Sequence, residues 1–304
     1  MFSGKESVIN DVRHTLERGG YETIVYENSC FDIIAKKDSG AGSGMLFLKA
    51  LLNIDSLVQQ HARDMKIISG VTGSFCGIVG TRTRYEKMDD GIVYERFGLA
   101  AFTPKLLEKM VVYQEFPFLF RDKGGLYAGV DHKKLRKARE EKDLTQEKLA
   151  KRIGITKKSV YEHESRDMRM LLPYAKKASR VLDENIMSPF GLESCDASGS
   201  GGAPNTSVER EVFLCFRKMG FETRCIKKSP FNVIAKEEEP LFAHAGKKLP
   251  EKKIAKELKS LSDIAKSQVL VISEEECRDL PSIKRKKLRK IVSKDELFDI
   301  LNKF

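Results

Sequence analysis

The sequence lacks several patterns on which common classes of protein depend. Its six cysteines are scattered and include no CxxC pair. That spacing argues against a zinc site and against a disulfide framework, and it suits a reducing compartment. The N-terminus has no signal-peptide core, and no apolar run approaches the length of a membrane span. We therefore expect a soluble protein of the cytoplasm that does not associate with a membrane.

The signatures of common enzymes are missing as well. The five histidines form no HExxH motif, and no serine or cysteine stands in a nucleophile-elbow context. A glycine-rich stretch spans residues 39–44, but the Lys-Ser/Thr pair that completes a phosphate-binding loop does not follow it. A flexible hairpin turn fits this stretch better. These absences argue against an enzyme and give no sign of a cofactor.

Positive charge is concentrated in two parts of the chain. The formal net charge is +11, but residues 1–115 carry 14 basic and 15 acidic side chains, a net charge of −1. Residues 131–170 carry 13 basic and 8 acidic side chains, or +5, and residues 247–304 carry 16 and 10, or +6. This distribution is expected of a chain that binds a polyanion through its middle and its C-terminal third.

Two short helices joined by a tight turn are predicted at the centre of the chain. The apolar side chains there follow helical spacing, stop and resume; they are Leu149, Ala150, Ile153, Ile155 and Val160. Thr145 and Thr156 are placed to cap the two helices, because a threonine hydroxyl can accept a hydrogen bond from an unpaired backbone amide. Gly154 stands where the first helix ends, a usual position for left-handed backbone. The pattern predicts a helix-turn-helix.

This stretch and its flanks resemble the phage-repressor (Cro/XRE) class of DNA-binding domain. The residues that carry the resemblance are Leu135-Arg136, Arg139-Glu140, Leu144-Thr145-Gln146, Leu149-Ala150, Gly154-Ile155, Val160 and Glu164. One departure is Ser165-Arg166-Asp167, where that class usually places a glycine. His163 falls at a position that is usually apolar, so we expect it to be partly buried and not to act as a ligand.

The resemblance implies that the N-terminal end of the second helix enters the major groove of duplex DNA. Lys157, Lys158 and Tyr161 share one face there and are expected to reach base edges, while Gln146 is placed to meet a phosphate. The full set of expected DNA-binding residues is Thr145, Gln146, Thr156, Lys157, Lys158, Ser159, Tyr161 and Glu162. A solvated basic face in a protein-interaction bundle is the alternative interpretation.

An internal repeat surrounds this central unit. Residues 207–236 align with residues 7–36 without a gap, and 11 of the 30 positions are identical. The match resumes with Leu241-Phe242-Ala243-His244-Ala245 against Leu46-Phe47-Leu48-Lys49-Ala50. In the first copy the residue pattern predicts helices over 7–18, 56–69 and 103–112, and strands over 21–26, 30–35, 45–50, 75–80, 92–96 and 99–102. The sequence therefore predicts two copies of one α/β domain.

Each copy resembles the restriction-endonuclease-like, or PD-(D/E)xK, fold. That family places an aspartate on one strand and an acid-x-lysine motif on the next, to hold Mg²⁺ and orient a water. Asp32 and Lys49 match the aspartate and the lysine, but Phe47 stands at the acid position, and a phenyl ring cannot coordinate a hard cation. In the second copy the three positions are Asn232, Phe242 and His244. We expect both copies to be non-catalytic and without a metal.

The expected fold class is α/β plus all-α, with two restriction-endonuclease-like domains flanking a Cro/XRE-type bundle. Its boundaries are a nuclease-like domain over 1–115, a linker over 116–130, the helix-turn-helix domain over 131–191, a flexible linker over 192–206 and a second nuclease-like domain over 207–304. The arrangement resembles a group of archaeal helix-turn-helix transcriptional regulators, which share the aromatic- and glycine-rich entry seen here at 113–130.

The leading hypothesis is a sequence-specific DNA-binding transcriptional regulator that is not an enzyme. Its expected partner is double-stranded DNA, and we expect a homodimer because one such domain reads only a half-site. The α/β copies would serve dimerisation or sensing, with the effector and the operator left open. Two alternatives remain: a Mg²⁺-dependent nuclease targeted by the helix-turn-helix, and a protein-interaction or antitoxin-like module.

Overall fold

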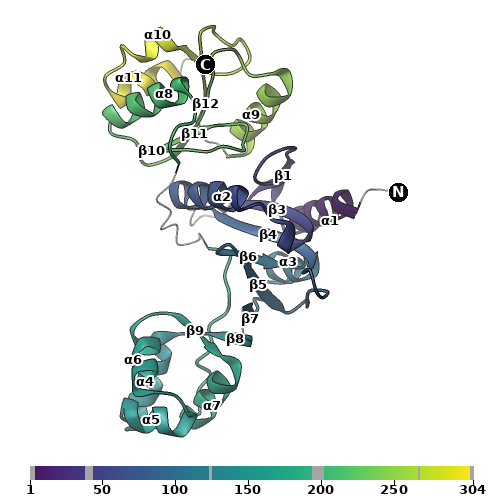
Figure 1. Cartoon of the computed structure of the whole chain (residues 1–304), viewed down its shortest axis with the longest axis vertical. Helices are drawn as coiled ribbons and strands as arrows, with labels where there is room; N and C mark the ends of the chain where they lie inside the picture. Colours follow the sequence, from purple (N-terminus) through teal and green to yellow (C-terminus); the bar gives the residue numbers. More distant parts are fainter. Residues whose placement is uncertain (1–3, 38–43, 123–124, 194–201, 266–267, 302–304) are drawn as a thin grey trace.

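The computed structural model describes residues 4–37, 44–122, 125–193, 202–265 and 268–301. These residues form three lobes in a row (Figure 1). We call residues 4–122 the N-lobe, residues 125–193 the helix-turn-helix lobe and residues 202–301 the C-lobe; the N-lobe lies in the middle. No helix in these ranges combines the length and the apolar composition that a membrane crossing requires. The glycine-rich stretch is described only at Gly44, so the predicted hairpin turn lies outside the described residues.

The N-lobe is an α/β domain in which helices cover both faces of a sheet. Its helices are α1 (Gly4–Arg18), η1 (Ile54–Ser56), α2 (Gln59–Thr72) and α3 (Pro104–Val111), and its strands are β1 (Glu22–Val25), β2 (Ile33–Lys36), β3 (Met45–Asn53), β4 (Phe75–Arg82), β5 (Ile92–Arg96), β6 (Leu99–Phe102) and β7 (Leu119–Asp122). One face packs against α1 and α3 and the other against α2. All nine elements predicted for this copy are present, with their ends within three residues of the expected positions.

The C-lobe repeats the core of the N-lobe. Its elements are α8 (Ser207–Lys218), β10 (Glu222–Cys225), β11 (Val233–Lys236), β12 (Pro240–Ala245), α9 (Lys252–Ala265), β13 (Gln268–Ser273), β14 (Ser282–Lys284), α10 (Arg285–Leu288) and α11 (Lys294–Leu301). The strand registers confirm the alignment of the two copies, because Ile34 pairs with Phe47 and Ile234 pairs with Phe242.

The helix-turn-helix lobe forms where the capping pattern predicts it. Its elements are β8 (Gly125–Val130), α4 (His132–Glu141), α5 (Gln146–Ile153), α6 (Lys157–Ser165), β9 (Met168–Leu171) and α7 (Leu172–Leu182). Thr145 Oγ1 accepts a hydrogen bond from the Lys148 amide, and Thr156 Oγ1 accepts one from the Ser159 amide, each at 3.1 Å. Gly154 ends α5 with a φ of 86°, a backbone angle that glycine adopts without strain.

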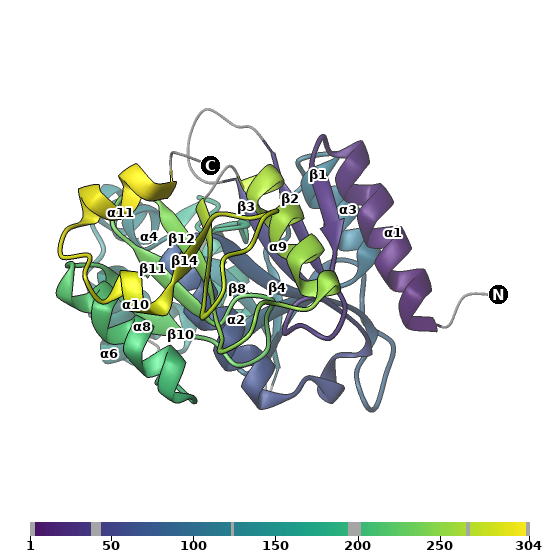
Figure 2. The same ribbon diagram turned by 90° about the horizontal axis from the view of Figure 1, so that it is seen from above.

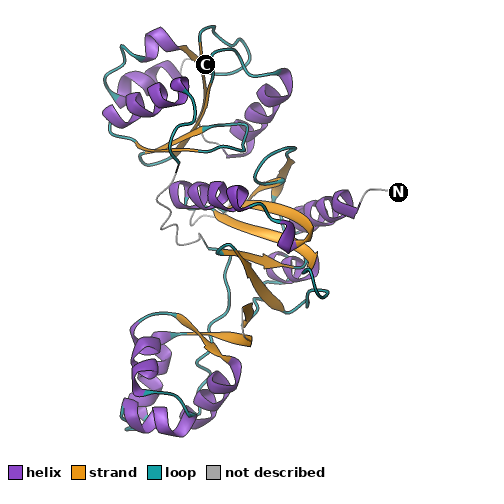
Figure 3. Ribbon diagram, in the orientation of Figure 1, coloured by secondary structure: helices purple, strands orange, loops and turns teal. Residues whose placement is uncertain are grey.

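The segment 116–130 is not a bare linker. It contributes β7 and β8, which pair with each other, while β7 also pairs with β5 and β8 with β9. The result is one nine-stranded sheet in the order β1-β2-β3-β4-β6-β5-β7-β8-β9. Its strands run from the N-lobe to the helix-turn-helix lobe (orange in Figure 3). Gly129 in β8 is required by close packing, because a Cβ there would lie 2.8 Å from the Ser188 carbonyl oxygen. Paired strands thus join the helix-turn-helix lobe to the N-lobe.

Side chains reinforce this junction. Phe190, near the end of the helix-turn-helix lobe, packs against three rings of the N-lobe: Phe75, Phe102 and Phe120. The distances from its ring centroid to theirs are 6.0 to 6.4 Å. Arg169 in β9 donates from Nη1 to Glu95 Oε2 at 2.8 Å, and its guanidinium lies 4.2 Å from the centroid of Phe120. Since β9 directly follows α6 and its loop, these contacts hold α6 in a defined orientation relative to the N-lobe.

The two α/β copies pack on each other reciprocally. α2 of the N-lobe lies against β10 and β11, and α9 of the C-lobe lies against β1 and β2 (Figure 2). Phe31 stacks on Phe231, its counterpart in the repeat, with ring centroids 6.3 Å apart. The Lys228 carbonyl accepts hydrogen bonds from the Cys30 amide at 2.7 Å and from Ser29 Oγ at 3.2 Å. Because residues of both lobes share one buried core, the copies form an approximate two-fold pair within a single chain.

Ala150 marks the crossing of α5 and α6 and is only 3% exposed. We expect Ala150→Leu to overpack this crossing at a cost of about 1–3 kcal/mol, measured as a lower melting temperature with a parallel loss of DNA binding. Lys151→Leu changes the exposed neighbouring position and should alter stability by less than about 0.5 kcal/mol. Ala150→Leu protein that melts like the parent would show that the two helices do not pack closely here.

Candidate nucleic-acid interface

The N-terminal end of α6 presents an exposed basic surface. Lys157, Lys158 and Tyr161 are all exposed, and Tyr161 keeps 60% of its surface accessible. Lys158 Nζ lies 3.9 Å from Glu162 Oε1, a surface pair that contributes little to stability. The Lys157 side chain makes no hydrogen bond or ion pair with another described residue. Two cations and a phenol are therefore available to a partner, on the face that the spacing predicts.

The other predicted DNA-binding residues lie on α5 and α6 or at the N-caps of these helices. Thr145 and Thr156 use Oγ1 to accept hydrogen bonds from backbone amides, which leaves each hydroxyl proton available to donate to a phosphate oxygen. Ser159 and Glu162 are half-buried. Six of the eight predicted residues thus lie on α6 or at its cap, and the other two lie at the start of α5.

Gln146 helps to hold α6 in place. Its Nε2 donates to Glu164 Oε2 at 2.8 Å. Glu164 is buried and also accepts from Arg139, at 2.6 Å from Nε and 3.1 Å from Nη2. Arg139 Nη1 in turn donates to the Leu144 carbonyl at 2.7 Å. Glu164 therefore connects α6 to α4 and α5. A contact between Gln146 and a phosphate stays a prediction, and it would have to use polar atoms of Gln146 that are not hydrogen-bonded to Glu164.

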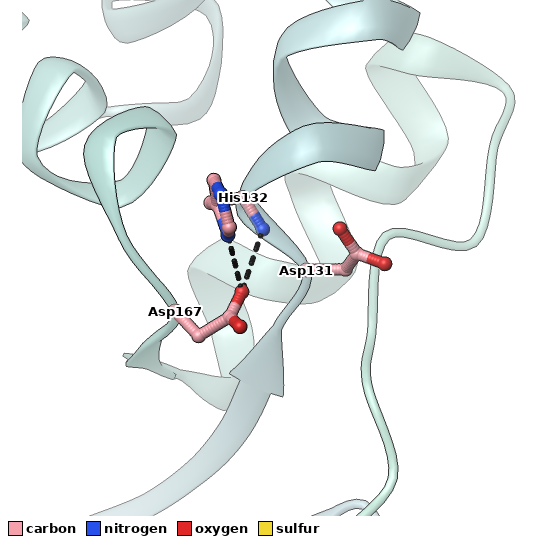
Figure 4. A group of neighbouring side chains, drawn as sticks. All are labelled: Asp131, His132 and Asp167. Atoms are coloured by element: carbon pink, nitrogen blue, oxygen red, sulfur yellow. Dashed lines mark hydrogen bonds and ion pairs between the residues drawn. The ribbon is translucent and has the colours of Figure 1, made fainter.

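The stretch Ser165-Arg166-Asp167, where the Cro/XRE class usually has a glycine, is held in place by hydrogen bonds of Asp167. Asp167 Oδ1 accepts hydrogen bonds from the backbone amide and from Nδ1 of His132, at 3.1 and 2.6 Å (Figure 4). The His132 contact holds the pKa of the Asp167 carboxyl below its ordinary value. Asp131 caps α4 by accepting from the Lys133 and Lys134 amides. The group Asp131, His132 and Asp167 is compact enough for a cation, but His132 Nδ1 and one oxygen of each carboxylate already serve these contacts.

His163 is only 7% exposed, which confirms the prediction that this residue is at least partly buried. Burial lowers the pKa of its imidazole, which favours the neutral form. Its Nδ1 has no hydrogen-bond partner among the described residues. His163 therefore belongs to the packing of α6 and does not face a DNA partner.

The nuclease-like site of the N-lobe brings Asp32 and Lys49 together. Lys49 Nζ lies 3.1 Å from Asp32 Oδ1 and also donates to the Ser29 carbonyl at 2.7 Å. Asp32 Oδ2 accepts from the Ala50 amide at 2.9 Å. A further cation, Lys5 from α1, lies 2.9 Å from Asp32 Oδ1. The sequence pattern predicted the first pair, but Lys5 was missed because it lies outside the two motif strands.

These residues do not fit the Mg²⁺ that the fold family implies. Such an ion needs several oxygen ligands, whereas both oxygens of Asp32 already serve protein contacts and two ammonium groups lie beside them. Phe47 at the acid position is fully buried, and its ring packs edge-on against Phe31 with centroids 5.1 Å apart. The local charge is therefore positive, which disfavours binding of a second cation.

The equivalent site in the C-lobe keeps the hydrogen bond from a backbone amide to the side chain at the aspartate position, but that side chain is the neutral Asn232. Asn232 Oδ1 accepts from the Ala245 amide at 2.7 Å, as Asp32 does from Ala50. Asn232 Nδ2 donates to Glu209 Oε1 at 3.1 Å and to the Ala245 carbonyl at 2.8 Å. His244 is hydrogen-bonded through Nδ1 to the Pro230 carbonyl at 2.8 Å, and burial lowers its pKa. These partners satisfy the site internally without a metal ion.

Comparison with known proteins agrees with both resemblances. Residues 5–117 match the family model of the PD-(D/E)XK superfamily domain, and residues 135–186 match a helix-turn-helix model. The chain matches no solved structure.

Full-length relatives come from archaea. A protein of Pyrococcus abyssi is 30% identical, and one of Pyrococcus horikoshii is 31% identical, in each case over 98% of this chain and 97% of the relative. A third, from Methanobrevibacter smithii, is 27% identical over 98% of this chain and 97% of the relative. All three bear the name "putative HTH-type transcriptional regulatory protein". With its central Cro/XRE-type unit and its nuclease-like flank, the chain belongs to this archaeal family of HTH-type transcriptional regulatory proteins.

Proposed function

We propose that the protein is a sequence-specific DNA-binding transcriptional regulator that inserts the N-terminal end of α6 into the major groove. The observation that carries this proposal is the exposed face of Lys157, Lys158 and Tyr161 on a helix capped for a helix-turn-helix. Lysine can donate to the acceptors of guanine, and the tyrosine can contact base edges or the thymine methyl group. The names of the relatives agree with this role.

The surrounding residues position the helix on DNA. Thr145 and Thr156 cap the starts of the two helices, where a hydroxyl proton and the unpaired backbone amides can donate to a phosphate. We assign Gln146 and Ser159 to the same phosphate-contacting set, and Glu162 to the rim of the base-reading face. These contacts fix the register of α6, whereas Lys157, Lys158 and Tyr161 supply sequence preference.

The test is the affinity of the full-length protein for a selected duplex and a scrambled duplex at two salt concentrations. A regulator should prefer the selected duplex, and its affinity should fall steeply with salt as counterions are released from the phosphates. A protein-interaction module that meets an acidic partner through the same basic face would bind both duplexes equally weakly, which would refute the proposal.

We propose that the flanking α/β copies are non-catalytic, acting in dimerisation or sensing, in the cytoplasm. Purified protein should therefore leave plasmid and linear duplex DNA uncut in the presence of Mg²⁺ or Mn²⁺, because Asp32 is paired with Lys5 and Lys49 and Phe47 offers no ligand. The measurement is gel analysis after prolonged incubation, with the Asp32→Ala protein in parallel. Cleavage that disappears in Asp32→Ala would restore the nuclease interpretation.

We further propose that the regulator binds DNA as a homodimer. Two such domains related by a two-fold axis read half-sites about 34–36 Å apart along the duplex. Sedimentation should give a dimer on DNA, and footprints should cover two inverted half-sites. The N- and C-lobes already cover part of each other's surface, so deleting the C-lobe tests whether the copies also hold the dimer. Full-length protein that occupies a non-palindromic site once, as a monomer, would contradict the proposal.

A further inference from the structure

The two-fold pairing of the N- and C-lobes creates two grooves at equivalent places. One groove lies between α2 of the N-lobe and the start of the C-lobe, and its lining includes Lys227 just beyond β10. The other lies between α9 of the C-lobe and the segment after β1, and its lining includes Glu27. Glu27 and Lys227 are equivalent positions in the repeat, since the two copies are offset by 200 residues. Each groove is thus formed by both copies.

The grooves have opposite charge. The first is lined by three cations, Arg63, Lys66 and Lys227, and one carboxylate, Asp64. The second is lined by three carboxylates, Glu27, Glu251 and Glu257, and one cation, Lys253, and Lys253 is paired with Glu27. The basic groove encloses about 470 Å³ and the acidic groove about 190 Å³. Duplicated elements have therefore diverged into one basic and one acidic groove, and the basic groove is the larger.

Two of the three cations of the basic groove make no direct contact with another side chain of the fold. Arg63 and Lys227 are exposed, and their side chains make no hydrogen bond or ion pair with another described residue. Asp64 beneath them is buried, and its two oxygens accept from Gln60 Nε2 at 2.9 Å and from the Lys228 amide at 3.1 Å. The carboxylate thus braces the junction between the lobes and leaves the two cations without a direct partner.

Apolar side chains also line the basic groove. Ile67 from α2 and Ala203 and Pro204 from the segment before α8 line the groove, together with the buried Cys225. A volume of this size falls within the range of small-molecule sites, which combine apolar walls with a few polar groups that fix orientation. Arginine and lysine together suit a phosphate: the guanidinium fork can make two parallel hydrogen bonds to its oxygens, and the ammonium group adds a second positive charge.

We propose that the groove between α2 and residues 202–205 binds a small organic phosphate, with Arg63 and Lys227 on the phosphate and Ile67 and Pro204 against the organic part. The site bridges the two lobes, so an occupied groove favours the paired arrangement of the copies. This inference is independent of DNA binding by α6, because it rests only on the junction of the N- and C-lobes.

Titration calorimetry of the full-length protein with adenosine monophosphate, inorganic phosphate and adenosine tests the proposal. We expect adenosine monophosphate to bind more tightly than either fragment, because only it engages both the cations and the apolar wall. The double variant Arg63→Gln/Lys227→Gln should weaken its binding at least roughly tenfold, the loss expected when charged hydrogen bonds to a phosphate are removed. Both positions are exposed, so the variant should melt at the parent's temperature in the absence of ligand.

The repeat supplies a matched control. Lys256→Gln/Lys259→Gln makes the same change of charge on exposed positions of α9, the equivalent helix, outside the acidic groove. It should leave binding within about twofold of the parent, since long-range electrostatics are screened by salt. The proposal is overturned if adenosine monophosphate does not bind at about 1 mM, if adenosine binds as tightly, or if the two double variants lose affinity equally.

Discussion

Replacing Arg139 with methionine should destabilise the helix-turn-helix lobe by about 3–5 kcal/mol, the cost of breaking a buried ion pair from one side. The Arg139 guanidinium makes two hydrogen bonds to the buried Glu164 carboxylate and a third to the Leu144 carbonyl. Methionine fills similar volume but leaves the carboxylate with only the Gln146 amide. Because Glu164 lies on α6, DNA binding should be lost together with the thermal transition of this lobe.

Arg136→Met is the matched control on the same helix. Arg136 is exposed and pairs with Glu140 one turn on, at 3.0 Å. Exposed pairs of this kind contribute about 0.3–0.5 kcal/mol, so Arg136→Met should change the melting temperature little. Melting should be followed by circular dichroism. If Arg139→Met and Arg136→Met were equally mild, the Arg139–Glu164 pair would not determine the position of α6.

Alanine at Lys157, Lys158 or Tyr161 should relax sequence preference without unfolding the protein. All three side chains are exposed, so their removal opens no cavity. Loss of a base contact costs about 1–3 kcal/mol on the cognate site and far less on random DNA. At the upper end this is a loss of roughly a hundredfold in affinity for the selected duplex. The measurement is fluorescence anisotropy with selected and scrambled duplexes.

Lys151→Ala and Arg152→Ala on α5 distinguish recognition of the base sequence from nonspecific electrostatic attraction to DNA. Both residues are exposed and lie before the turn, so they should weaken binding to all sequences alike and reduce the salt slope by about one unit. Gln146→Ala should also weaken both duplexes alike, but it should lower stability too, because Gln146 donates to Glu164. Equal losses on both duplexes for Lys157→Ala, Lys158→Ala and Tyr161→Ala would mean that α6 does not read sequence.

Local chemistry explains which parts of the fold the sequence predicts. Thr145, Gly154 and Thr156 act within a few residues of their own positions, and all three have the predicted backbone role. The short strands β7, β8 and β9 depend instead on partners distant in the chain, such as the pairing of Tyr127 with Leu171. From the sequence alone Gly129 is easily taken for a turn residue, because the close packing of its backbone against Ser188 cannot be foreseen. A segment of this kind carries too little local pattern to separate a strand from a linker.

The candidate sites likewise contain residues that the sequence predicts and contacts that it does not. The motif of the nuclease-like fold predicted Asp32 and Lys49 correctly, since Asp32 directly precedes β2 and Lys49 lies on β3, which pairs with β2. Lys5 could not be found this way, because it lies outside the two motif strands and its counterpart in the repeat is Asn205. Nor could the stacking of Phe31 on Phe231 be inferred from their identity alone, because a repeat shows that two domains are alike and not that they touch.

Selection of binding sites from a random duplex pool tests the central claim most directly. Full-length protein should enrich one motif made of two inverted half-sites, with centres about one helical turn apart. The Lys157→Ala/Lys158→Ala protein, selected from the same pool, should enrich it weakly or lose specificity at the positions that these side chains contact. A pool that stays random after repeated rounds, although the protein retains duplex DNA at low salt, would contradict sequence-specific recognition by α6.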